Sequence, residues 1–175
     1  MSKVMLICVL VCCTSISVGC ASRQTYIPPA EPMVTWGYDS ISNPIENKDF
    51  KVYIEPVPWY PKTREYRAFS LKVLNKTNKI IEVVWNKTYF LLNGNANGCF
   101  MFEGVMYKDR NNPIHNDIVF ENTTLTRIIL PNNLVTNMPS WLHKEIPLGE
   151  VGIYITVKVE EIEISEKASV KIWRK

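Results

Sequence analysis

Residues 153–160 read Ile-Tyr-Ile-Thr-Val-Lys-Val-Glu, and their alternation decides the fold class. Every second side chain is aliphatic: Ile153, Ile155, Val157 and Val159. The side chains between them are tyrosine, threonine, lysine and glutamate. A period of two is typical of a β-strand that has one face on a core, so this stretch predicts a half-buried strand.

Working outward from residues 153–160, other stretches have the same character. Further strands are predicted at 50–55, 69–73 and 80–92, and one or two more at 162–172. Turn residues separate them: Asn75–Lys79, predicted as a hairpin connection, the double Asn-Gly stretch Asn93–Gly98, Asp109–Pro113 and Pro131–Asn133. Short strands, frequent turns and almost no 3.6-residue period predict an all-β fold. We expect one antiparallel immunoglobulin-like β-sandwich over residues 36–175.

The first nineteen residues have the pattern of an export signal. Lys3 gives a positive start, residues 4–13 are an uninterrupted apolar run, and residues 14–19 are small and weakly polar. The apolar run is shorter than the roughly 20 residues that cross a bilayer. We therefore predict a cleaved signal peptide. One alternative is cleavage by an ordinary signal peptidase after Gly19 or Ala21.

The end of this leader resembles the lipobox of bacterial lipoproteins. Ser17-Val18-Gly19-Cys20 has two small residues before a cysteine, although Ser17 stands where an aliphatic residue is usual. The resemblance implies cleavage before Cys20, a thioether-linked diacylglycerol on its sulfur and a third acyl chain, such as palmitate, on its amino group. Ala21, rather than aspartate, implies sorting to the outer membrane of the cell envelope.

A proline-rich stretch follows the predicted lipid anchor. Residues 20–35 contain Pro28, Pro29 and Pro32, which block regular structure and stiffen a chain. The first interpretation is a spacer between the membrane and the domain. The alternative is a short partner-binding arm around Tyr26 and Trp36.

Cysteine usage agrees with a lipid anchor. Removal of the leader leaves Cys20 and Cys99 from five cysteines, and acylation of Cys20 leaves Cys99 alone. If Cys20 is not acylated, a Cys20–Cys99 disulfide is the alternative. Because Phe100 and Met101 follow it, we expect Cys99 to pack as a small buried hydrophobe.

Charge and motifs exclude several classes of function. Without the leader the chain has 19 basic and 17 acidic side chains, a balance too even for nucleic-acid binding. The two histidines, His115 and His143, have no metal-ligand spacing, and no CxxC, GxSxG or phosphate-binding glycine loop is present. We therefore expect no metal, no cofactor and no catalysis. A small hydrolase using Cys99 with a histidine and Asp117, and a carrier of an apolar ligand between the sheets, are the alternatives.

The densest part of the chain runs from Trp85 to Pro113. It contains Trp-Asn-Lys-Thr-Tyr at 85–89, Phe-Met-Phe-Glu-Gly at 100–104 and Tyr-Lys-Asp-Arg-Asn-Asn-Pro at 107–113. The structural interpretation is a central hairpin with Trp85 and Phe102 in the core and Asp109 and Arg110 bracing a turn. The functional interpretation is a binding loop that presents Tyr107, Asp109 and Arg110.

These motifs also resemble a group of uncharacterised bacterial lipoproteins that have an immunoglobulin-like domain. The resemblance covers the leader and about residues 74–134, and it implies an envelope location and a fold rather than a chemistry. Together, these features predict a lipid-anchored protein of the bacterial envelope. We expect it to act as a protein-binding or structural module whose partner is another envelope protein.

Overall fold

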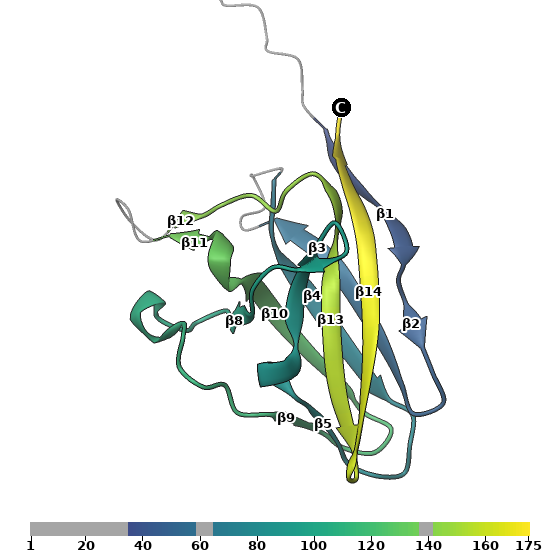
Figure 1. Cartoon of the computed structure of the whole chain (residues 1–175). Coiled ribbons are helices and arrows are strands. Elements are labelled where there is room, and N and C mark those ends of the chain that lie inside the picture. Colours follow the sequence, from purple (N-terminus) through teal and green to yellow (C-terminus); the bar gives the residue numbers. More distant parts are fainter. Residues whose placement is uncertain (1–34, 59–64, 137–141) are drawn as a thin grey trace, which may run out of the picture. The chain divides into compact units, whose positions relative to one another are not determined.

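The computed structural model describes residues 35–58, 65–136 and 142–175, and within them the fold is an immunoglobulin-like β-sandwich (Figure 1). The predicted leader, Cys20 and most of the tether lie outside these residues. Trp36, the other end of the alternative binding arm, belongs to a strand, and its ring packs edge-on against Tyr66 with centroids 6.3 Å apart.

The first sheet is built on a long hairpin and is antiparallel throughout. Its strands are β1 (Trp36–Ser42), β14 (Ile162–Arg174), β13 (Gly149–Val159), β5 (Ile81–Val83) and β9 (Asp117–Val119), in that order, with β6 (Tyr89–Leu92) also on β13 and β7 (Asn95–Ala96) on β6. The predicted strand at 153–160 is therefore confirmed as the central β13. The region at 162–172, for which one or two strands were expected, forms the single strand β14 (Figure 1).

The second sheet packs against the first. Its strands, also antiparallel, are β2 (Ile45–Glu46), β3 (Phe50–Pro58), β4 (Tyr66–Asn75), β10 (Thr124–Pro131) and β8 (Phe100–Phe102). A small ribbon pairs β11 (Val135–Thr136) with β12 (Leu142–His143). Three 3-10 turns complete the fold: η1 (Trp85–Lys87), η2 (Tyr107–Asp109) and η3 (Asn132–Leu134).

The space between the sheets is filled by side chains from both. Phe90 of the first sheet lies between Phe69 and Phe100 of the second, with ring centroids 6.2 Å away in each case. All three rings are at most 2% exposed, and Ile153 and Val157 of β13 are buried beside them in the same core. Interdigitated aromatic and aliphatic side chains are the main source of stability in such a sandwich.

The first Asn-Gly step forms the predicted tight turn. Leu92 pairs with Asn95, so Asn93 and Gly94 alone connect β6 to β7. Both have positive φ, 50° and 81°. This backbone is the one that Asn-Gly adopts most readily, because asparagine and glycine tolerate the left-handed region.

Two predicted connections are wrong. Asn75–Lys79 is not a hairpin turn, because β4 belongs to the second sheet and β5 to the first, so this segment crosses between the sheets. The region from Trp85 to Phe102 is not a central hairpin either, because β6 pairs with β13 whereas β8 pairs with β10. In both cases the turn residues were recognised, but β5 and β6 pair with the distant β13 and β8 pairs with β10, while the short β7 is the local partner of β6.

Candidate functional site

A pocket of about 250 Å³ lies where the motifs of the dense region meet. We call it the η1–η2 pocket, and ten residues line it: Trp85, Asn86, Cys99, Phe100, Arg110, Asn111, Asn112, Pro113, Ile114 and Asn132. Trp85 and Phe100 are 2% exposed and belong to the core. Four of the other lining residues are asparagines, and Arg110 is the one charged residue in the lining.

The 3-10 turn η1 forms one wall because it interrupts a strand. β5 and β6 both pair with β13, Val83 opposite Val157 and Tyr89 opposite Tyr154. Residues 84–88 therefore lie opposite only two residues of β13, Ile155 and Thr156. An insertion of this kind is a bulge, which re-aims side chains at the edge of a site. Here it places the indole of Trp85 in the core and Asn86 at the pocket.

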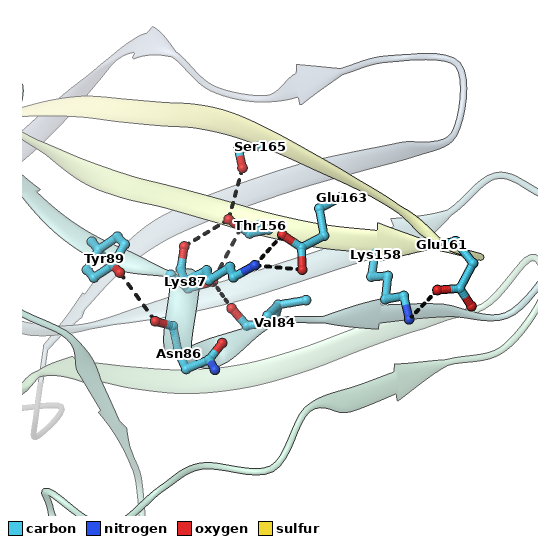
Figure 2. A network of polar contacts seen from close by, with 10 residues as sticks. Val84, Asn86, Lys87, Tyr89, Thr156, Lys158, Glu161, Glu163 and Ser165 are labelled. Atoms are coloured by element: carbon cyan, nitrogen blue, oxygen red, sulfur yellow. Dashed lines mark hydrogen bonds and ion pairs between the residues drawn. The ribbon is translucent and has the colours of Figure 1, made fainter.

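The bulge is fixed by a network of polar contacts (Figure 2). The Thr88 hydroxyl donates to the Val84 carbonyl oxygen at 2.9 Å and accepts from the Thr156 N–H at 3.4 Å. The Thr156 hydroxyl donates to the Lys87 carbonyl oxygen at 2.8 Å and lies 3.0 Å from the Ser165 hydroxyl. Thr88 and Thr156 are almost completely buried, so these hydrogen bonds satisfy polar groups that water does not reach.

The remaining residues of this motif also contact the bulge. Lys87 Nζ forms an ion pair with Glu163 of β14 at 2.6 Å, and the Tyr89 hydroxyl donates to the Asn86 carbonyl oxygen at 3.3 Å (Figure 2). Glu163 lies on an exposed face of β14. Glu161, at the tip of the β13–β14 hairpin, forms an ion pair with Lys158 at 3.3 Å. The motif at 85–89 therefore has a structural explanation for four of its five residues, and Asn86 is the exception.

Trp85 is anchored at both ends. Its ring stacks edge-on against Phe102, 4.6 Å between centroids, and its Nε1–H donates to Asp117 Oδ2 at 3.1 Å. Asp117 also accepts two hydrogen bonds from the Arg127 guanidinium, which raises the pKa of Arg127. Trp85 thus lies in the core as predicted, whereas Phe102 is partly buried and packs against the core. The buried indole N–H is hydrogen-bonded, as buried indoles usually are.

The η2 turn presents the predicted binding residues. The Arg110 guanidinium lies over the Tyr107 ring, 3.9 Å from its centroid, and Nη1 donates to the Tyr107 carbonyl oxygen at 3.0 Å. Asp109 Oδ1 accepts from Asn112 Nδ2 at 3.3 Å. Asp109 and Arg110 brace the turn as predicted, through separate bonds. Of the three predicted residues, only Arg110 lines the η1–η2 pocket.

Asn132 joins this turn to the rest of the fold. Its Nδ2 group donates to the Arg110 carbonyl oxygen at 3.3 Å and to Asn111 Oδ1 at 3.0 Å. Because a backbone carbonyl can only accept, the Arg110 contact fixes which end of the amide is nitrogen. Asn132 Oδ1 is buried and has no hydrogen-bond partner within the described part of the chain. Sequence reasoning placed Asn132 only in a loop and missed this role.

The prediction that Cys99 is buried is wrong. Cys99 is exposed and lines the η1–η2 pocket. The buried positions are taken by Phe100, whose ring meets Phe90, and by Met101, whereas Cys99 precedes the first residue of β8. Phe100 and Met101, whose apolar side chains suggested that Cys99 is buried, are themselves the buried residues.

The partners of the alternative hydrolase do not lie together in this pocket. Neither His115 nor His143 lines it, and the Asp117 carboxylate is bonded to Arg127 and Trp85. His143 is 4% exposed in β12, where burial and then the nearby Arg67 lower its pKa. Within residues 35–58, 65–136 and 142–175, no cluster of three potential metal ligands is found.

The predicted lipid anchor at Cys20 lies outside the described residues. Among the residues that are described, no helix has the length and apolar character needed to cross a membrane. No protein-family model matches this chain, and no curated protein matches it either.

Proposed function

We propose that this chain is a lipid-anchored lipoprotein of the bacterial cell envelope, held in the outer membrane through Cys20, that binds another envelope protein and catalyses no reaction. One observation supports the binding role above the others. Arg110 is held in place at the η1–η2 pocket, yet it makes no ion pair with a carboxylate in the described residues. A charged side chain that is positioned but unpaired is typical of recognition.

The scaffold supports this proposal. The pocket walls rest on buried anchors, Trp85 on one side and Phe100 on the other, so the recognition loop is attached to a rigid core. The export signal, the lipobox-like Ser17–Cys20 and the proline-rich tether fit a domain that stands away from a membrane surface. The resemblance to envelope lipoproteins over about residues 74–134 covers all ten residues that line the pocket.

The test is crosslinking in intact cells. A photoreactive amino acid replaces Lys108, an exposed residue of the η2 turn, and adducts are identified by mass spectrometry. We expect one specific adduct, which Arg110→Ala or Tyr107→Ala weakens. The matched control is Lys171→Ala, which removes an exposed cation from β14 in the first sheet. A yield above background that neither loop variant changes would reject the loop as the binding surface.

The alternative hydrolase has one observation in its favour, the exposure of Cys99 at the pocket. It requires that a thiol probe labels Cys99 in the native protein and that Cys99→Ser abolishes function. The binding proposal expects Cys99→Ser to leave the crosslinked adduct in place. The alternative carrier requires an apolar cavity between the sheets, where the structure places Phe69, Phe90 and Phe100.

A further inference from the structure

The outermost strand of the first sheet, β1, has an open edge (Figure 1). Thr35 and Lys175 exchange both backbone hydrogen bonds, at 2.7 and 2.9 Å, so every second residue from Thr35 onward bonds to β14. The residues between them, Trp36, Tyr38 and Ser40, therefore direct their N–H and C=O groups away from the sheet. These groups have no hydrogen-bond partner within residues 35–58, 65–136 and 142–175, so they form a template for another strand.

The other edges of the sandwich are short or blocked. β2 and β7 have two residues each and β8 and β9 have three, whereas β1 has seven. Where β3 extends past β2, the Asn43 side chain bonds to both the N–H and the C=O of Ile54, at 3.0 and 2.6 Å. Pro56, the next residue that faces this edge, has no N–H to donate. A further strand can therefore pair over several residues only at β1.

A pocket of about 400 Å³ adjoins the open edge. We call it the β1–β3 pocket; Tyr38 of β1 lines it, together with Asn43, Pro44, Tyr53 and Glu55. The Tyr38 hydroxyl donates to Glu55 Oε1 at 3.3 Å, and Glu55 forms no ion pair in the described part of the chain. The volume is within the roughly 300–1,000 Å³ of ligand pockets, so an aromatic side chain can enter.

We propose that a second copy of this chain pairs its β1 antiparallel with this edge, about a two-fold axis at Tyr38, and inserts its Trp36 into the β1–β3 pocket. In this register each Tyr38 faces Tyr38 of the second copy, and each Trp36 faces Ser40. Because each of these three pairs exchanges two backbone hydrogen bonds, the strands form six in all. The inference goes beyond the proposed function, because this surface is separate from the η1–η2 pocket and does not depend on it.

The β1–β3 pocket favours a copy of β1 over an arbitrary strand. The Ser40 hydroxyl donates to the Asn43 carbonyl oxygen, so the residue that faces Trp36 of the second copy is joined directly to the pocket. Trp36 and Tyr38 both contact Tyr66 and pack against the core, which places their side chains on the pocket side of β1. Trp36 of the second copy points to that same side, where its indole N–H can donate to Glu55.

The other face of β1 does not oppose this pairing. Asp39 is the one charged residue in β1, and the two-fold axis places it opposite Gly37 of the second copy, so like charges do not face each other. One strand pair with two aromatic anchors is a small interface, which is typical of a weak dimer. Attachment of both copies to one membrane would raise their effective concentration and favour the pairing.

The first test is photo-crosslinking in intact cells that express two differently tagged versions of the full chain. p-Benzoylphenylalanine replaces Tyr38, which keeps an aromatic ring at this position. The matched control places the same amino acid at Tyr154, an exposed tyrosine of β13 in the same sheet. We expect adducts that contain both tags at about five times the control yield or more, and mass spectrometry should place them at residues 36–44 of the second copy.

The second test measures the dimer dissociation constant of the purified full chain by analytical ultracentrifugation. Trp36→Ala should raise this constant about tenfold or more, because each dimer loses two anchors. Since Trp36 also contacts its own domain, Glu55→Ala serves as a second variant; it changes an exposed residue and should raise the constant several-fold. Tyr154→Ala, the matched aromatic control, should change it less than about twofold.

Each outcome bears on the inference. Doubly tagged adducts at residue 38 that Trp36→Ala and Glu55→Ala weaken would support it. A chain that stays monomeric up to about 200 μM and gives no doubly tagged adduct would overturn it, as would adducts at residue 38 with a different protein only. A dimer that neither variant weakens would reject this pairing. The proposed function fails separately, when the probe at Lys108 traps no envelope protein.

Discussion

Asn75 holds the crossing between the two sheets, and its replacement should cost several kcal/mol. The side chain is fully buried, and Nδ2 lies within hydrogen-bond distance of the Lys79, Val119 and Phe120 carbonyl oxygens, at 2.6, 3.1 and 3.1 Å. Oδ1 accepts from the Thr77 N–H at 2.9 Å and from its hydroxyl at 2.8 Å. The amide has two N–H groups, so four bonds are made at once.

The magnitude follows from these bonds. Each contributes about 0.5–1.5 kcal/mol net, and a buried carbonyl left without a donor costs about 1–3 kcal/mol. We therefore expect Asn75→Ala to lower the free energy of unfolding by about 3 kcal/mol. A domain of this size has roughly 5–15 kcal/mol in total, so the urea midpoint should fall by about 1–2 M. Tryptophan fluorescence of the full chain, through the buried Trp85, reports the transition.

A second substitution tests the geometry itself. Asn75→Asp keeps the shape and the oxygen that accepts from Thr77, but it turns the other oxygen toward three carbonyl groups. Burial and this repulsion raise the pKa of the introduced carboxyl above its unfolded value of about 3.9. The unfolded state then loses its proton first as pH rises, so the stability deficit should be larger at pH 7.5 than at pH 4.5.

The control for both variants is Asn78→Ala. Asn78 is exposed in the same segment, and its loss should change the free energy of unfolding by no more than about 0.5 kcal/mol. Two results would contradict the stabilising role inferred for the Asn75 amide. One is a loss of less than 1 kcal/mol of unfolding free energy in Asn75→Ala, and the other is an equal loss at both pH values in Asn75→Asp.

Three further predictions concern other parts of the chain. The pKa of buried His143 is lowered, so on acidification the unfolded state binds a proton before the folded state does. The free energy of unfolding should therefore fall as pH drops below about 6.5. His143→Gln should flatten that slope in urea titrations at pH 5–7.5. Gly152→Ala should cost about 2–3 kcal/mol, because the added methyl group would lie 2.1 Å from the Ala168 carbonyl oxygen, and an unchanged melting temperature would contradict it. Cys20→Ala should move the protein from the membrane to the soluble fraction and prevent labelling by a palmitate analogue; a labelled, membrane-bound variant would reject the anchor.

Local patterns predicted the strands well and their partners poorly. The alternation at 153–159 and the Asn93-Gly94 turn were readable, because each depends on neighbouring residues alone. The crossing at 75–79 was not, since the Asn75 side chain donates to the carbonyl oxygens of Val119 and Phe120, more than forty residues away. A polar residue that ends a strand looks the same whether the chain turns back in one sheet or crosses to the other.

The same limit explains which part of the candidate site could be predicted. Arg110 stood out because a charged residue among turn formers has no core role to explain it, whereas Asn132 resembled any loop asparagine. The η1 bulge could not be predicted, because residues 80–92 have uniform β character. It becomes evident only from the pairing with β13, where Val83 lies opposite Val157 and Tyr89 opposite Tyr154, so that five residues of one strand face two of the other.

The bulge links the fold to the proposed site. If residues 84–88 continued the strand without interruption, Asn86 would lie in the ladder of the first sheet instead of at the pocket. Thr88 and Thr156 hold the insertion with buried hydrogen bonds, and neither of them lines the pocket. These bonds keep the irregular segment hydrogen-bonded while it places Trp85 in the core and Asn86 in the lining of the η1–η2 pocket, which Arg110 and Asn132 also line.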